Sequence, residues 1–157
     1  MLTLFSLSFA GYFSPIASPR TFTKPLTAML QFASDPNNID QVSKYVDQLA
    51  AKYRLGQEKH ANLLISLTEA VNNAIIHGNK QDTSKMVRIG CAASKNRIAI
   101  RVSDQGNGFN PSALPDPTSP ERLLECGGRG VFLINQLCDD VRYSDGGSTV
   151  EMRFNLR

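Results

Sequence analysis

Three polar side chains recur every four residues in the segment EAVNNAIIHGN, residues 69–79. On an α-helix, Glu69, Asn73 and His77 lie at positions i, i+4 and i+8, so they share one face. The remaining faces are apolar, with Leu63, Leu64, Leu67, Ala70, Val71, Ala74 and Ile75. Burying an unsatisfied polar group costs roughly 1–3 kcal/mol. The polar face therefore indicates a polar cavity that holds a ligand. For this helix alone, an ordinary amphipathic helix with polar residues at its wet edge explains the pattern equally well.

Two glycine-rich segments could contribute to the same site. DQGNGF, residues 104–109, follows a predicted strand, and GGRG, residues 127–130, precedes a predicted helix. Glycines at a helix N-terminus let a phosphate approach the backbone N–H groups. Neither segment is a P-loop, since G-x-x-x-x-G-K-[ST] is absent, and no strand leads directly into a dinucleotide-binding G-x-G-x-x-G. Taken alone, a G-x-G after a strand is more often only a tight turn.

Apolar periodicity predicts the elements that must position these segments. They come in the order strand, two helices, two strands, helix, two strands: residues 26–33, 39–54, 58–77, 87–91, 98–102, 131–138, 141–144 and 150–154. Adjacent alternating strands favour a mixed, mostly antiparallel sheet with helices on one face, which is an α+β two-layer sandwich. Residues 109–127 hold four prolines and are typical of a lid or binding loop.

Composition predicts one soluble domain. The net charge is +3, and the basic residues are scattered, which argues against direct binding of nucleic acid. The first 13 residues, MLTLFSLSFAGYF, are apolar but too short to span a membrane and lack the positive start of a secretory signal. We therefore expect residues 1–25 to be an appendage, followed by a domain over residues 26–157. Cys91, Cys126 and Cys138 show no C-x-x-C spacing, which is typical of reduced thiols in a cytoplasmic protein.

Four motifs in this order resemble the nucleotide-binding boxes of the GHKL (histidine-kinase-like) ATPase superfamily. They are E-x-x-x-N with HGN, then D-x-G-x-G-F, then G-R-G-x-x-L-I, and finally G-[ST]-x-V near the end of the chain. Within that superfamily, the chain most resembles the bacterial anti-sigma factor serine-protein kinases, over roughly residues 26–157. The resemblance implies a Bergerat-type ATP-binding fold with ATP and Mg²⁺ as cofactors.

The resemblance also implies a role for each matching residue. Glu69 would be the general base and Asn73 the Mg²⁺ ligand, while Asp104 would accept a hydrogen bond from the adenine amino group. The other implied nucleotide-binding positions are His77, Gly106, Gly108, Phe109, Gly128, Arg129, Gly130, Val131 and Ser148. Ser148 stands where the family usually has threonine. Glu69 could instead orient a water for slow hydrolysis, and His77 fits a helix-end or lid contact better than a catalytic role.

The implied function is that of an ATP-dependent serine/threonine protein kinase acting as an anti-sigma factor. Such a protein sequesters a sigma factor and phosphorylates an anti-anti-sigma protein, and by analogy it forms a homodimer. The helix at residues 39–54 has no histidine, which argues against a sensor kinase that phosphorylates itself. Two alternatives stay open: an ATP-binding regulatory module that sequesters a partner without kinase activity, and a related fold that has lost nucleotide binding.

Overall fold

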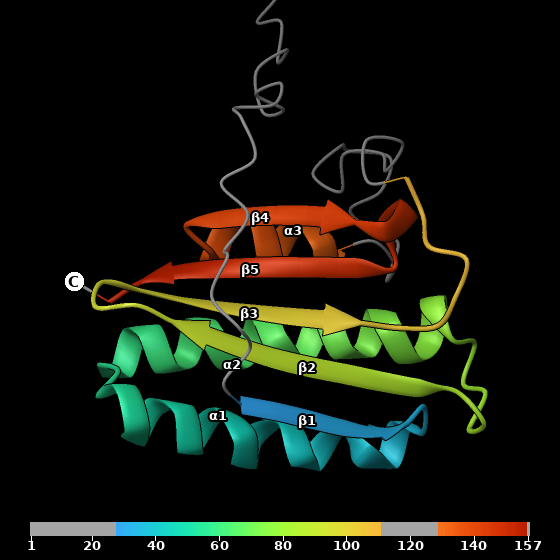
Figure 1. Ribbon diagram of the computed structural model, residues 1–157, viewed down its shortest axis with the longest axis horizontal. Helices are drawn as coiled ribbons and strands as arrows, with labels where there is room; N and C mark the ends of the chain where they lie inside the picture. The colour runs from blue at the N-terminus through green and yellow to red at the C-terminus, as the bar shows by residue number, and fades with distance from the viewer. Residues whose placement is uncertain (1–27, 111–128, 157) are drawn as a thin grey trace, which may run out of the picture.

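In the described part of the chain, five strands form an antiparallel sheet in the order β1-β2-β3-β5-β4 (Figure 1). The computed structural model describes residues 28–110 and 129–156. The strands are β1 (Ala28–Ala33), β2 (Met86–Ala93), β3 (Arg97–Ser103), β4 (Asp140–Ser144) and β5 (Thr149–Asn155). All four neighbouring pairs are antiparallel, so β1 and β4 are the two edges of the sheet.

Among the residues that the structure describes, three helices lie on one face of the sheet: α1 (Asp40–Tyr53), α2 (Gln57–Asn72) and α3 (Arg129–Leu137). In Figure 1, α1 and α2 lie behind β1 to β3, and α3 lies behind β4 and β5. A 3₁₀ turn, Pro36–Ile39, leads into α1, and the Asp35 side chain accepts a hydrogen bond from the Asn37 N–H at its start. At the end of α1, Arg54 takes a left-handed conformation with a φ of 53° and turns the chain towards α2.

The core lies between the sheet and the helices because alternate strand residues point at the helices. These inward residues are almost fully buried: Val87, Ile89 and Cys91 on β2, Ile98, Ile100 and Val102 on β3, and Val150, Met152 and Phe154 on β5. The helices meet them with Val42, Val46, Leu49, Leu63, Leu67, Ala70, Val71 and Ile134. In this layer α2 packs against α3, β3 and β5, while α3 packs against β4. The polar segments come together where α2 meets α3.

The predicted α+β sandwich with helices on one face is confirmed, as is the order of its elements. The sheet is antiparallel at every pair rather than mixed. The predicted boundary near residue 26, the appendage at residues 1–25 and most of the predicted loop at residues 109–127 lie outside the described residues. Within the described part of the chain, no helix is long and apolar enough to cross a membrane.

The helix that carries the polar face departs from the expected α-helix over residues 58–77. The α-helical part ends at Asn72, and Asn73–Gly78 form a π-helical turn. The Asn79 N–H donates to the Ala74 carbonyl at 2.8 Å, a bond that spans five residues rather than four. Apolar spacing cannot distinguish these two helix types here, because six residues make fewer than two turns of either. π-helical turns occur frequently at functional sites.

Candidate functional site

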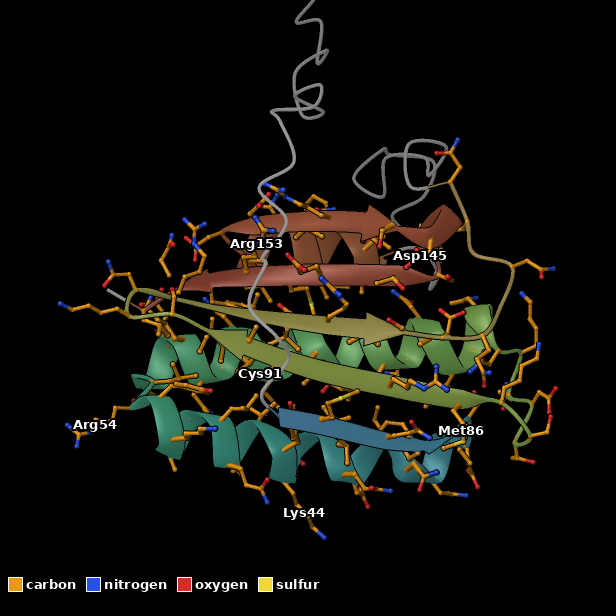
Figure 2. The ribbon with its side chains drawn as sticks, in the orientation of Figure 1. Lys44, Arg54, Met86, Cys91, Asp145 and Arg153 are labelled. Atoms are coloured by element: carbon orange, nitrogen blue, oxygen red, sulfur yellow. The ribbon has the colours of Figure 1, made fainter. Side chains whose placement is uncertain are left out.

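A cavity of about 340 Å³ lies at one end of the sheet, between α2 with its π-helical turn, the start of α3 and strands β3 to β5. Figure 2 labels two residues at this end, Met86 at the start of β2 and Asp145 in the turn between β4 and β5. Val102, Ile134 and Val150 give the cavity an apolar lining. The polar groups are few and come from the segments that the sequence singles out.

Most of the predicted site residues line this cavity: Asn73, His77, Asp104, Gly108, Phe109, Gly130, Val131 and Ser148. Glu69 lies beside it, against Gly130, and Gly106 lies against Asp104. Arg129 is exposed at the first residue of α3, and Gly128 lies outside the described residues. The structure thus brings the three segments to one place, while the role of each residue remains a prediction.

The start of α3 lies directly against the polar face of α2. A Cβ atom on Gly130 would lie 2.6 Å from Glu69 Oε2 and 3.4 Å from Asn73 Nδ2, so any larger residue there would displace the Glu69 carboxylate. The first N–H groups of a helix have no partner within the helix and attract anions. A carboxylate, a carboxamide and a helix N-terminus therefore meet at one wall of the cavity. Such groups suit a phosphate and a hard cation such as Mg²⁺.

Asp104 follows β3 and is held close to the π-helical turn. The Gly106 N–H donates to Asp104 Oδ1 at 2.7 Å, and the Asp104 N–H donates to the Ser148 carbonyl at 3.0 Å. A Cβ atom on Gly78 would lie 2.6 Å from Asp104 Oδ1, so the carboxyl group packs on that glycine. Desolvation by burial raises the pKa of Asp104 above its ordinary value of 3.8, against a lowering by the Gly106 N–H and by Lys85. Asp104 is thus a partly desolvated acceptor beside an apolar cavity.

This arrangement matches a known family. The family model described as "Histidine kinase-like ATPase domain" matches residues 32–154. The chain belongs to the histidine kinase-like ATPase family. Membership implies that the cavity binds ATP. The cavity fits that ligand because it combines an apolar lining, one carboxyl acceptor and the N-terminus of α3, where Gly130 has no side chain to cover the backbone N–H groups.

Curated relatives of this ATPase domain include several serine-protein kinases named RsbW. The one from Bacillus licheniformis is 30% identical over 124 residues, covering 74% of this chain and 78% of the relative. The one from Listeria monocytogenes serotype 4a is 26% identical over 130 residues, covering 78% and 83%. The one from Bacillus subtilis (strain 168) is 25% identical over 131 residues, covering 78% and 81%.

A solved structure has the same fold. It is the crystal structure of the RsbU and RsbW domains of a Mycobacterium tuberculosis protein, which matches with a TM-score of 0.56 at 16% sequence identity. The match covers 83% of this chain but 32% of the other, so this ATPase domain spans about a third of that larger chain.

Sequence patterns missed part of the cavity wall, and Tyr143 is the main example. Its ring meets the ring of Phe109 edge-on, with centroids 5.5 Å apart and an interplanar angle of 77°. Both rings line the cavity, and burial raises the pKa of Tyr143 to about 12. The alternation of β4 places Tyr143 on the inner face, opposite Val150. No sequence signal indicates its contact with a residue more than thirty positions earlier in the chain.

Gly130→Ala is expected to lower the affinity of this ATPase domain for ATP by about ten-fold or more. The added methyl group forces the Glu69 carboxylate aside and fills space between α2 and α3. The methyl group and the displaced carboxylate would take up space at the wall of the cavity, and a loss of about 1.4 kcal/mol of binding free energy is ten-fold in affinity. Calorimetric titration with ATP measures the effect. Gly56→Ala is the matched control, because a Cβ there meets nothing within 4 Å. Equal ATP affinity in both variants would contradict the prediction.

Proposed function

We propose that the protein is an ATP- and Mg²⁺-dependent serine/threonine protein kinase that acts as an anti-sigma factor. The observation that carries the proposal is the meeting of Glu69 and Asn73 with the glycine at the start of α3. That meeting provides a base and a metal ligand beside a phosphate-binding helix end. The relatives named serine-protein kinases support a protein hydroxyl as the acceptor of the phosphate.

The proposed site has one end that would bind the adenine base and another that would bind the phosphates. Asp104 would accept a hydrogen bond from the adenine amino group, and Phe109 and Tyr143 would contribute apolar wall. The backbone at Gly130 and Val131 would bind phosphate oxygens, with the positive end of the α3 dipole directed at them.

Asn73 is the residue that would hold Mg²⁺, since its carboxamide oxygen is a hard ligand. In the described residues, no group of three or more His, Cys, Asp or Glu side chains could hold a metal ion. The protein would therefore supply few ligands, as is usual for Mg²⁺ bound together with phosphates and waters. When bound, the ion would neutralise negative charge on the transferred phosphate.

Glu69 would then act as the general base. Its carboxylate would take the proton of a serine or threonine hydroxyl while that oxygen bonds to the γ-phosphorus. The bond between the γ-phosphorus and its bridging oxygen breaks, and that oxygen leaves with ADP. Glu69 is half-buried and held beside Gly130, so it lies at the wall where the phosphates would bind.

The proposed substrate is an anti-anti-sigma protein, and the sequestered partner is a sigma factor bound by a homodimer in the cytoplasm. Incubation with labelled ATP, Mg²⁺ and a candidate anti-anti-sigma protein from the same organism tests this. We expect label on a serine or threonine of the candidate. If the protein binds ATP and retains a sigma factor but transfers no phosphate, it is a regulatory module without kinase activity. Failure to bind ATP at millimolar concentration would contradict both the kinase and the ATP-binding regulatory module.

A further inference from the structure

We propose that Asn79 is a positioning residue that holds Asp104 in place for recognition of the adenine amino group. The inference rests on the proposed function, in which Asp104 accepts that hydrogen bond. Asn79 does not line the cavity, and the sequence alone assigns it no role although it ends the HGN motif. Its contacts connect the two parts of the site that recognise the base.

The side chain of Asn79 is fully buried, at 0% exposure, and forms hydrogen bonds to two other segments. Its Nδ2 donates to the Met86 carbonyl at 3.1 Å, and its Oδ1 accepts from the Gln105 N–H at 2.8 Å. Its own N–H donates to the Ala74 carbonyl at 2.8 Å. One residue therefore ties the π-helical turn to the first residue of β2 and to the residue that follows Asp104.

The bond to Gln105 matters because Asp104 is then held by backbone on both sides. On one side, the Asp104 N–H donates to the Ser148 carbonyl at 3.0 Å. On the other side, Asn79 fixes the Gln105 N–H, and the Gly106 N–H in turn donates to Asp104 Oδ1 at 2.7 Å. Without the Asn79 oxygen, the Gln105 N–H loses its buried partner and the Asp104–Gly106 segment loses its tie to the π-helical turn.

The segment around Asn79 also needs a strong tie because its backbone is strained. Lys80 and Gln81 both have a φ of 58°, in the left-handed region that residues other than glycine rarely adopt. Only Asn79 separates them from the π-helical turn. Strained backbone of this kind persists only where the surroundings over-determine it, and it concentrates at functional sites. The buried hydrogen bonds of Asn79 provide that constraint between the strained residues and Asp104.

The test compares the affinities of the full-length protein for ATP and for purine riboside triphosphate, which lacks the amino group. Calorimetry gives the ratio of the two dissociation constants. We expect the wild type to prefer ATP by about ten-fold or more, and Asn79→Ala to reduce this preference to near unity. Asn38→Ala is the matched control, because the Asn38 amide donates to the Ala33 carbonyl at 2.9 Å, in the 3₁₀ turn before α1 and away from the cavity. It is expected to lower the melting temperature but keep the wild-type preference.

Two further variants keep the outcome decisive. Asn79→Asp keeps an acceptor for the Gln105 N–H and loses the donor to Met86, so it is expected to retain more of the preference than Asn79→Ala. If Asn79→Ala does not fold, Asn79→Ser replaces it. The serine hydroxyl lies one bond nearer the backbone than the asparagine oxygen, so it does not reach the Gln105 N–H, and this variant too should lose the preference for ATP. A wild-type preference in Asn79→Ala or Asn79→Ser overturns the inference. If the wild type itself shows no preference, the role proposed for Asp104 fails instead.

Discussion

Glu69→Gln is expected to slow phosphate transfer to the protein substrate by about 10²–10⁴-fold, the usual contribution of a general base. Glutamine keeps the size of the side chain and its contact with Gly130, but it cannot accept the proton of the attacking hydroxyl. ATP affinity should change only a few-fold, because the base acts on the hydroxyl rather than on the nucleotide. Single-turnover transfer rates and calorimetric ATP affinities measure the two effects separately.

A second glutamate on the same helix provides the control. Glu58 lies in the first turn of α2, is exposed, and does not line the cavity, so Glu58→Gln should transfer phosphate at the wild-type rate. Transfer by Glu69→Gln at the wild-type rate would exclude Glu69 as the base. Loss of ATP affinity in parallel with the rate would instead show that Glu69 holds the nucleotide or its metal ion.

The fold could be predicted from the sequence because its elements carry clear periods. Val87, Ile89 and Cys91 alternate with polar residues, and in the structure all three are fully buried on the inner face of β2. The polar wall of the cavity, formed by Glu69 and Asn73, could also be predicted, because the two residues are four positions apart on one helix. Both lie against Gly130 in the structure. Local spacing therefore determined both the layers and the pair of side chains at the start of α3.

Features that depend on tertiary contacts could not be predicted in this way. Gly78-Asn79 has the sequence of a helix end, yet Asn79 bonds to Gln105, 26 residues later in the chain. The π-helical turn that precedes it has six residues, fewer than two turns of either helix type, so the apolar pattern fits both. The ring contact of Tyr143 with Phe109 depends on how β4 packs beside the segment after β3. For Asn79 and for Tyr143, the deciding partner is distant in sequence.

Asp104→Asn is expected to stabilise the ligand-free protein at neutral pH. Burial raises the pKa of Asp104 above 3.8, so the folded protein binds its proton more tightly than the unfolded chain does. The free energy of unfolding therefore falls as the pH rises from 3.8 through the folded pKa, and above that pKa the full cost of ionising the carboxyl is present. Asparagine avoids this cost, and its Oδ1 can still accept from the Gly106 N–H.

Urea unfolding between pH 4 and pH 8 measures this effect. The advantage of Asp104→Asn over wild type should be largest at the high end of that range and should shrink as the pH falls towards 3.8. Asp82→Asn is the matched control, for which the expected change in the free energy of unfolding has the opposite sign. Hydrogen bonds from Ser84 lower the pKa of Asp82, so its carboxylate stabilises the fold above its unfolded pKa and its replacement should destabilise it. An advantage that grows towards low pH would contradict the assignment.

The same substitution should reverse the nucleotide preference, because it changes what the cavity presents to the base. In Asp104→Asn the Gly106 N–H holds the Oδ1 of the new amide, so the remaining position carries an NH₂ group, which donates where the carboxylate accepted. ATP affinity should then fall by about ten-fold or more. The affinity for GTP should rise, because GTP presents a carbonyl in place of the amino group and that carbonyl can accept from the new NH₂ group. Calorimetric titration with both nucleotides measures the ratio. A more stable variant that still prefers ATP as strongly as wild type would show that Asp104 is desolvated without recognising the base.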